Sequence, residues 1–468
     1  MSLPSPPSQP ETPAELAPTT DGLLHLCPKF RILVIGNSGV GKSALINRVF
    51  GIKITDVSHA KRGEHNIDTP FEWPGNNRFI LHDSRGFETG EEKNLQTVLN
   101  FIDKRSKMSA LGDQLHAIWL CIKIPFASGR TFETADEQLL TEYKGKVPIF
   151  VVFTQLDVLY SRLEEKLDED MFSEIVDAAA QKRVQELCVA PLRALTPQQQ
   201  YPCEAVSVMP LLEKKKTIEG FVSKVLGQLT KDVWLTWAVV QRANADENIK
   251  ASIMVGKEEY WPGALSTLFD RSAMNKYLEV LCKDILCAWN MNDPNEYLRA
   301  PGFFSSVYTI VEDLHDTRPG KDYYKQSKLI LHDMIANPTT VIYNVLALAV
   351  VGISETLAKW KKDSNERFLR VLMGFIVDLM LTVDTLFWLT RHDPSEPLNI
   401  ELLETALGTY NSQKHDIHDS IRAWVHKQAS FEHRLSDNMI KEIERLIAQH
   451  RFTPDMNTRE VGQDTDEK

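Results

Sequence analysis

The chain has 468 residues, 43% of them hydrophobic and 25% charged, which allows two or three domains with at least one large core. Its formal net charge of −11 at pH 7 argues against non-specific nucleic-acid binding, which needs a basic surface. The six cysteines show no CxxC spacing, so we expect neither a zinc site nor a disulfide framework, and a reducing, cytoplasmic environment.

The two ends of the chain differ in composition from the rest. Residues 1–28 contain seven prolines and no Lys or Arg. This composition cannot bury a core, and it lacks the basic start and apolar stretch of a signal peptide. We therefore predict a disordered Pro-rich tail over 1–28 and a disordered acidic tail over 453–468.

Between the tails, the pattern changes once. Up to about residue 216, short apolar runs alternate with helical patterns, which predicts an α/β fold with a mostly parallel sheet. The runs are FRILVI (30–35), RFILHD (78–83), HAIWLCIKI (116–124), VPIFVVFT (147–154) and CEAVSV (203–208), with helical patterns at 42–51, 90–108, 132–145 and 159–188.

The second half carries only long amphipathic patterns, which predict an all-helical domain. We place the α/β domain at 29–230 and the helical domain at 231–452. The stretch RHDPSEP (391–397) interrupts the helices and leaves it open whether the last hairpin, 398–452, is a separate unit.

The first chemical motif follows the first strand. The stretch GNSGVGKS (36–43) fits G-x-x-x-x-G-K-[ST] between a buried strand and a helix, which predicts a phosphate-binding loop. Lys42 would reach the β- and γ-phosphates, and Ser43 would place its hydroxyl on Mg²⁺. The remaining predicted contacts come from the backbone of Gly36, Asn37, Ser38, Gly39, Val40, Gly41 and Ala44.

A D-x-x-G motif ends the second buried strand, in the stretch HDSRGFETG (82–90). Asp83 would lie in the outer coordination shell of Mg²⁺. Gly86 would place its N–H near the γ-phosphate and act in catalysis.

The third motif is VVFTQLDVLY (151–160), which resembles the guanine-reading pattern [NT]-K-x-D with Gln155 in place of the lysine. Asp157 would accept hydrogen bonds from the ring N–H and the amine of guanine, which adenine cannot offer. Gln155 would cover the base only partly, so we expect weaker binding with guanine preference retained. Thr154 completes the pattern, and Ser207 with Val208 is a weaker candidate for a backbone donor to the guanine carbonyl.

A threonine that reaches Mg²⁺ is harder to find. Thr69 lies in IDTPFEW, which reads as part of a hairpin with RFILHD, so we expect it on a strand and away from the metal. The loop at 55–66 then offers Thr55 or Ser58, and the sequence does not choose between them.

These motifs, in this order, resemble the translation-factor-related class of P-loop GTPases. Within that class the chain resembles fungal G domain-containing proteins, which are distantly similar to Era-like and immunity-related GTPases, over most of residues 29–390. The closer resemblance rests on HDSRGFETGEEKNLQTVLNFI (82–102), HAIWLCIKIPFASGRTFETADEQLL (116–140), KASIMVGKEEYWPGALS (250–266) and LCKDILCAWNMNDP (281–294).

The resemblance implies binding of GTP and GDP with Mg²⁺ and slow GTP hydrolysis. Phe87 follows Gly86 at the position where Ras-like proteins carry a water-positioning glutamine. GTPases with an apolar residue there often need a partner or a second G domain, which implies a nucleotide-dependent homodimer or an unknown protein partner. A nucleotide-binding scaffold without significant hydrolysis is the competing hypothesis.

Two apolar stretches raise the question of a membrane. Val341–Ile353 covers only ~20 Å as a helix, against the ~30 Å of a bilayer core. The stretch 371–389 is longer but contains Asp378 and Asp384, each costing up to ~3 kcal/mol near the bilayer centre. We therefore favour buried helices of a soluble bundle over a peripheral membrane contact.

Overall fold

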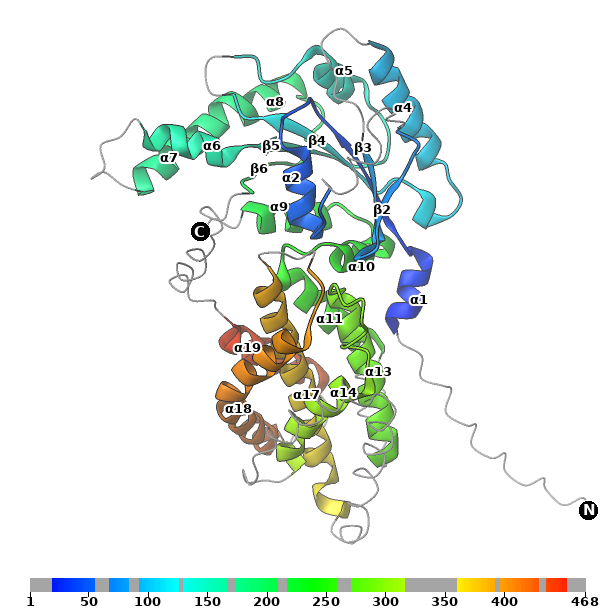
Figure 1. The fold of residues 1–468 in the computed structure, drawn as a ribbon, viewed down its shortest axis with the longest axis vertical. Coiled ribbons are helices and arrows are strands. Elements are labelled where there is room, and N and C mark those ends of the chain that lie inside the picture. Colours follow the sequence, from blue (N-terminus) through cyan, green and yellow to red (C-terminus); the bar gives the residue numbers. More distant parts are fainter. Residues whose placement is uncertain are drawn as a thin grey trace, which may run out of the picture.

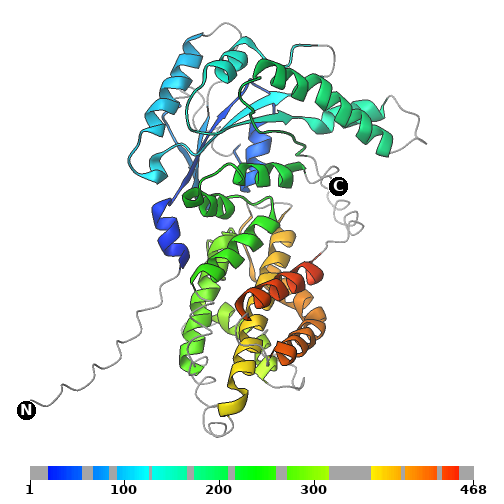
Figure 2. The ribbon, with the colours of Figure 1, turned by 180° about the vertical axis from the view of Figure 1, so that it is seen from behind.

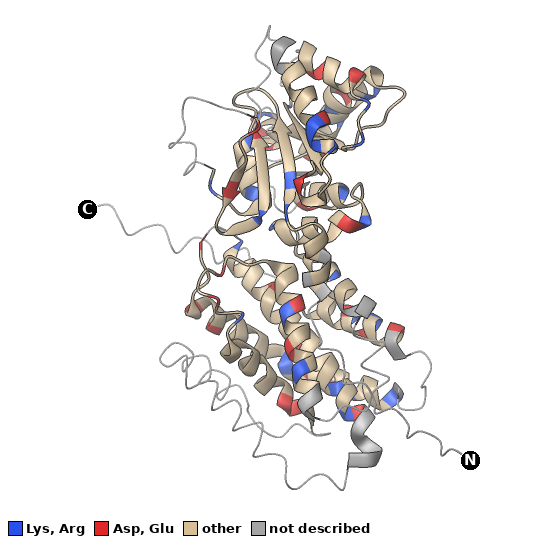
Figure 3. Ribbon diagram, turned by 90° about the vertical axis from the view of Figure 1, so that its right-hand side faces the viewer, with Lys and Arg blue, Asp and Glu red and all other residues tan. Residues whose placement is uncertain are grey.

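The protein forms two lobes, an α/β lobe and a helical lobe, which lie end to end along the long axis (Figures 1 and 2). Acidic and basic positions are interspersed along the elements of both lobes (Figure 3). The computed structural model describes residues 19–54, 67–83, 92–125, 129–165, 173–208, 217–259, 271–315, 360–391, 396–428 and 435–452.

Six strands of the described chain form one sheet in the order β2-β3-β1-β4-β5-β6. All neighbouring strands are parallel except the edge pair, in which β2 runs antiparallel to β3. The predicted hairpin and the mostly parallel sheet are confirmed. The strands are β1 (Phe30–Ile35), β2 (Phe71–Trp73), β3 (Asn76–Asp83), β4 (Ala117–Lys123), β5 (Ile149–Thr154) and β6 (Cys203–Ala205).

Helices cover both faces of the sheet, which explains why its central strands are apolar without alternation. In β1, Ile32 and Val34 face one helical layer, whereas Leu33 and Ile35 face the other. The first layer contains α2 (Lys42–Phe50), α9 (Thr217–Leu226) and α10 (Lys231–Val240). The second contains α4 (Glu92–Ser106), α5 (Thr134–Glu142), α6 (Leu156–Glu164), α7 (Ser173–Val184) and α8 (Ala190–Leu195), with a π-helical turn (Gln185–Val189) before α8.

Helix α10, just after the predicted domain boundary at 230/231, contributes to both lobes: Trp237 lies in the core of the α/β lobe, whereas Ala238 lies in a small core with Ala251 of the helical lobe. Trp237 is fully buried and packs against Phe30, with ring centroids 5.0 Å apart, and edge-on against Trp119 at 6.1 Å. Phe50 and Phe79 stack beside them at 3.7 Å. The core of the α/β lobe therefore extends past the predicted boundary into α10, the helix that joins the two lobes.

The predicted disorder of residues 1–28 is wrong from Thr19 onwards. Helix α1 (Thr19–Leu26) packs Leu24 in a small core with Leu235. Its Thr20 backbone N–H donates to Asp284 Oδ1 at 2.9 Å, and the Thr20 hydroxyl donates to the same oxygen at 2.5 Å. A composition averaged over 28 residues concealed this short apolar segment. Residues 1–18 and 453–468 lie outside the described residues.

The helical lobe has a single core around α17. Residues of the last hairpin, such as Tyr410 and Ile443, belong to this core, so the hairpin is not a separate unit. The helices are α11 (Ala245–Glu259), α13 (Arg271–Trp289), α14 (Pro301–Val311) with a 3₁₀ turn (Glu312–His315), α17 (Trp360–Thr390), α18 (Ile400–Gln428) and α19 (Leu435–His450).

Helix α17 is also the one described helix that is long and apolar enough to span a membrane, over Glu366–Thr390. In the most apolar window of this segment, 94% of the residues are buried inside the protein. The two aspartates of this segment have partners: Asp378 accepts from Tyr410, and Asp384 pairs with Arg451 at 2.9 Å. The stretch 341–353 lies outside the described residues.

Candidate nucleotide-binding site

The loop between β1 and α2 has a backbone that favours glycine at three positions. Gly36, Gly39 and Gly41 have φ values of 146°, 75° and 99°, which L side chains rarely adopt. A Cβ at Gly36 would also lie 2.4 Å from the carbonyl oxygen of Cys121. The glycines therefore allow the tight loop that the motif predicts.

Lys42 lies over this loop. Its Nζ donates to the carbonyl oxygens of Gly36 at 2.7 Å and Asn37 at 3.1 Å. Ser43 and Ala44, in the first turn of α2, are exposed. A helix N-terminus with exposed N–H groups, a lysine ammonium and a folded glycine loop is suited to binding phosphates.

The loop after β5 is joined to the phosphate loop by two hydrogen bonds. The Thr154 hydroxyl donates to the Val40 carbonyl at 2.5 Å, and Gln155 Nε2 donates to the Gly39 carbonyl at 2.8 Å. Gln155 adopts a left-handed backbone with φ 62°. Asp157 follows in the first turn of α6 and is partly exposed. The structure thus brings the first and third motifs, the phosphate loop and the loop with Asp157, side by side.

Ser207 and Val208 lie beside this loop, after β6. The preceding Val206 N–H donates to the Phe153 carbonyl at 2.8 Å, which holds the segment on β5. The Ser207 N–H donates to Thr217 Oγ1 at 3.2 Å, so this amide takes part in the fold. Of the two predicted base donors, Val208 fits the role better.

Asp83 ends β3 and lies opposite Val34 in the register of β1, two residues before Gly36. Its carboxylate and the Ser43 hydroxyl are oxygen ligands of the kind that Mg²⁺ prefers, so the residues present fit this metal. Among the described residues, no group of three His, Cys, Asp or Glu could hold a metal alone. A Mg²⁺ ion here would therefore depend on phosphate oxygens as well.

Several predicted residues lie outside the described chain, namely Gly86, Phe87, Thr55 and Ser58. The predicted position of Thr69 is wrong: it lies in a bend before β2 and not on a strand. Pro70 follows it and has no backbone N–H to give to a strand ladder, which explains the later start of β2.

Sequence reasoning missed a buried pair next to the predicted metal residue. His82 is fully buried, and burial lowers its pKa to about 4, so it is neutral at pH 7. Its Nε2 accepts from Arg31 Nη1 at 2.9 Å, and its Nδ1–H then donates to the Ile67 carbonyl at 2.7 Å. The only signal was a His and an Arg at inward positions of apolar strands.

A hollow of about 230 Å³ lies between the phosphate loop and the start of α5. It is lined by Asn37 on the loop and by Arg130 and Asp136 on the other side. Burial raises the pKa of Asp136 to about 6, and its carboxylate accepts from the Glu133 N–H at 3.0 Å to cap α5. The phosphate loop thus has polar space beside it.

Comparison with known proteins gives matches over the region that holds this site. Residues 31–155 match the family model described as 50S ribosome-binding GTPase, and residues 297–461 match a domain of unknown function (DUF8505). GTPase Era of Chromobacterium violaceum is 26% identical over 164 residues, which cover 33% of this chain and 52% of that protein. The chain therefore spans about half the length of this curated relative.

A crystal structure of a mutant S. thermophilus NFeoB bound to GDP is similar at 13% identity over 68% of this chain and 97% of that one. Its TM-score of 0.23 is too low to carry an argument. The family match over residues 31–155 and the mostly parallel six-stranded sheet agree on the fold. The chain has a P-loop GTPase domain of α/β fold, followed by a helical region.

Proposed function

We propose that this protein binds GTP and GDP with Mg²⁺, hydrolyses GTP slowly, and couples its nucleotide state to the helical lobe. One observation carries the proposal: the phosphate loop and the loop with Asp157 are joined by the bond from Gln155 to Gly39. A loop that binds phosphates and a loop that reads a base then lie at fixed separation, as one nucleotide requires.

Each residue has a physical role in this proposal. The N-terminus of α2 and Lys42 stabilise negative charge on the phosphates, and charge stabilisation with positioning is the main catalytic contribution to phosphoryl transfer. Ser43 and Asp83 would hold Mg²⁺, which neutralises charge on the phosphate oxygens when bound. Gly86 stays the predicted backbone donor to the γ-phosphate.

Base specificity rests on Asp157, whose carboxylate would pair with two N–H groups of guanine. An adenine in its place would leave a carboxylate without these donors, which disfavours it strongly. The Gln155 amide donates to the phosphate loop, and its short stem would cover little of the base. We therefore propose guanine preference with reduced affinity.

The finer parts of the proposal rest on the sequence motifs. They are membership of the fungal G domain-containing proteins, a cytoplasmic location, and a nucleotide-dependent homodimer or protein partner that completes catalysis. Phe87 supports slow hydrolysis by the isolated chain, because a phenyl ring cannot polarise water.

Phosphate release in a single turnover with Mg-GTP tests the activity. We expect slow release by the wild type and none by Lys42→Ala, which loses the charge over the phosphate loop. Specific activity that rises with protein concentration would support the dimer. If the wild type releases phosphate no faster than Lys42→Ala at any protein concentration, the proposed GTPase activity is wrong. The competing hypothesis, a nucleotide-binding scaffold, would then remain.

A further inference from the structure

Helix α2 and strand β3 each have one end near the phosphate loop, and their other ends meet on the side of the helical lobe. Helix α2 starts at Lys42 and ends at Phe50, and β3 runs from Asn76 to Asp83. The Asn76 side-chain amide donates to the Phe50 carbonyl at 3.0 Å and to the Val240 carbonyl at 2.8 Å. The far ends of both elements are therefore fixed to one another.

Arg242 joins this place to the helical lobe. Its N–H donates to the Val49 carbonyl at 2.7 Å, at the end of α2. Its guanidinium donates to the carbonyl of Gly75, in the β2–β3 turn, and to that of Asn290 at 2.6 Å, just after α13. Asn290 Nδ2 in turn donates to Asn76 Oδ1 at 3.2 Å. We call Gly75, Asn76, Arg242 and Asn290 the Arg242 junction.

Burial makes the Arg242 junction sensitive to small displacements. Arg242 is 5% exposed and Asn76 is 1% exposed, so these groups lie away from bulk water and a hydrogen bond lost there is costly. Burial lowers the pKa of Arg242 only to about 10, so the guanidinium stays charged at pH 7. A buried charge whose carbonyl partners move must find new ones, which favours discrete arrangements over gradual ones.

A second link ties the end of α17 to the α/β lobe. Arg391 pairs with Glu219 of α9 at 2.5 Å and lies over the ring of Trp388 at 4.4 Å. Its carbonyl accepts from Arg48 Nη1, on α2, at 3.1 Å. Both α13 and α17 thus end close to groups that are hydrogen-bonded to α2 or to the β2–β3 turn.

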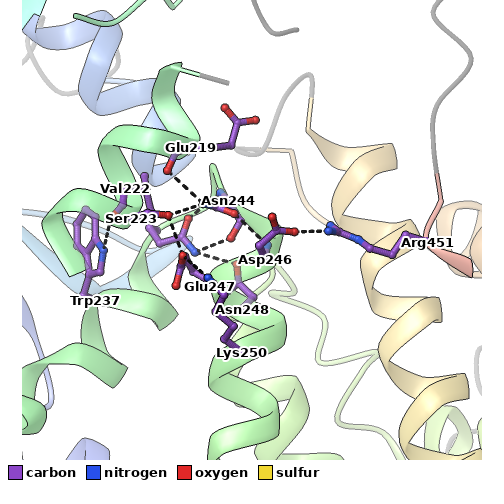
Figure 4. A network of polar contacts seen from close by, with 11 residues as sticks. Glu219, Val222, Ser223, Trp237, Asn244, Asp246, Glu247, Asn248, Lys250 and Arg451 are labelled. Atoms are coloured by element: carbon purple, nitrogen blue, oxygen red, sulfur yellow. Dashed lines mark hydrogen bonds and ion pairs between the residues drawn. The ribbon is translucent and has the colours of Figure 1, made fainter. Parts of the chain in front are cut away.

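The corner between α9 and α11 is held differently (Figure 4). Asn244 Nδ2 donates to the Glu219 carbonyl and to Ser223 Oγ, both at 3.2 Å, and Ser223 donates to Glu247 Oε1 at 2.7 Å. These bonds fix α9 on α11. By contrast, a hollow of about 20 Å³, room for about one water molecule, lies beside Arg242.

We propose that the Arg242 junction transmits the nucleotide state to the helical lobe through the β2–β3 hairpin. This inference rests on the proposed function. The hairpin lies between 55–66 and 84–91, the two segments expected to respond to the γ-phosphate, and β3 carries Asp83 at its other end. Because β2 is the edge strand, a shift of β2 and of the turn at Gly75 would leave the pairing of β3 with β1 intact.

Hydrogen–deuterium exchange of the full chain tests the proposal, with GDP and with a non-hydrolysable GTP analogue. In the wild type we expect exchange to differ between the two states at the phosphate loop and also around residues 286–292. In Asn290→Ala, which removes one bond of the junction, the difference at 286–292 should disappear while that at the phosphate loop stays.

Gly75→Ala gives a second perturbation, since its Cβ would lie 2.9 Å from Asn292 Oδ1. Gly220→Ala is the matched control, because nothing lies within 4 Å of a Cβ there. Gly75→Ala should behave like Asn290→Ala, and Gly220→Ala like the wild type.

Three results would overturn the inference. One is a wild type whose residues 286–292 exchange equally in both states although the phosphate loop differs. Another is a difference at 286–292 that survives in both junction variants. The third is a wild type that binds no nucleotide and shows no change at the phosphate loop, which would overturn the proposed function as well.

Discussion

Two sets of polar residues, one in each lobe, are placed in opposite ways. In the α/β lobe, Ser43 and Asp157 stand at element ends and are exposed or partly exposed. In the helical lobe, Asp378 and His418 are fully buried and bind one another, with His418 Nε2 3.2 Å from Asp378 Oδ2. The first arrangement is open to a ligand, whereas the second is complete without one.

The buried cluster of the helical lobe combines two acids and two bases. His418 Nδ1 also lies 3.0 Å from Asp313 Oδ2, and Arg422 pairs with the same oxygen at 2.7 Å. Tyr410 donates to Asp378. The charges balance inside the core, which makes the cluster costly to break but weak evidence of net stabilisation. The following changes test this contrast between the lobes.

The largest expected effect is in the helical lobe. Asp378→Ala leaves Tyr410 and the Nε2 of His418 without their buried partner, although His418 keeps Asp313 on its other nitrogen, and should destabilise the fold by about 3–5 kcal/mol, measured by urea unfolding. GDP affinity of the folded variant should be unchanged. Asp419→Ala is the control, since Asp419 is 63% exposed and should change stability by less than about 0.5 kcal/mol. A loss below about 1 kcal/mol for Asp378→Ala would contradict the account.

Asp157→Asn should have the opposite effect, with little change in stability and a large loss of nucleotide affinity. The carboxylate is replaced by a near-isosteric amide at a partly exposed position, so stability should change by less than about 1 kcal/mol. GTP affinity should fall by at least about 100-fold, with a shift toward xanthine nucleotides, as calorimetry would show. Glu164→Gln, exposed at the other end of α6, is the matched control. Unchanged GTP affinity in Asp157→Asn would rule out its role in base reading.

The buried cluster also predicts a pH dependence. Burial opposes the charge on His418, but Asp378 and Asp313 outweigh it and raise the pKa of His418 above 6.5. The bound proton therefore stabilises the fold below pH 6.5, and this contribution is lost as the pH rises through the folded-state pKa. Burial raises the pKa of Asp313, but His418 and Arg422 lower it overall, so its contribution is lost only in acid.

Urea unfolding of the wild type and His418→Gln at several pH values measures this effect. The stability difference between the two proteins should be greatest near about pH 6 and shrink as the pH rises. A difference that is constant or grows toward high pH would contradict the assigned direction.

The smallest effect concerns Gln155. A lysine there has a longer stem to cover the base and can still donate to the Gly39 carbonyl. Gln155→Lys should therefore tighten GTP binding by about 3- to 10-fold, or about 1 kcal/mol. Gln155→Ala, which removes the donor, should weaken it. Weaker binding by Gln155→Lys would show that the amide is the better group in this loop.

The sequence predicted the α/β lobe well because its signals are local. The strands β1, β3, β4 and β5 coincide with continuous apolar runs, and the glycines of the phosphate loop follow from one motif. Thr69 was predicted on a strand, but Pro70 follows it and β2 starts only at Phe71. The link from Gln155 to Gly39 spans two distant segments, so no local pattern could reveal it.

The helical lobe was less predictable because its packing depends on contacts between segments that are distant in the sequence. Amphipathic patterns give its helices but not what each helix packs on, so the packing of α10 against both lobes was not predicted. The pairing of Asp378 with His418, 40 residues apart, depends on the crossing of α17 and α18. The junction around Arg242 likewise depends on how three separate chain segments meet.

Binding of Mg-GDP and Mg-ADP to the wild type, measured by calorimetry, tests most directly the claim that the loop after β5 reads guanine beside the phosphate loop. The account predicts that GDP binds and that ADP binds at least about 100-fold more weakly. Neither nucleotide should bind to Lys42→Ala. Equal affinity of the wild type for GDP and ADP would contradict the account.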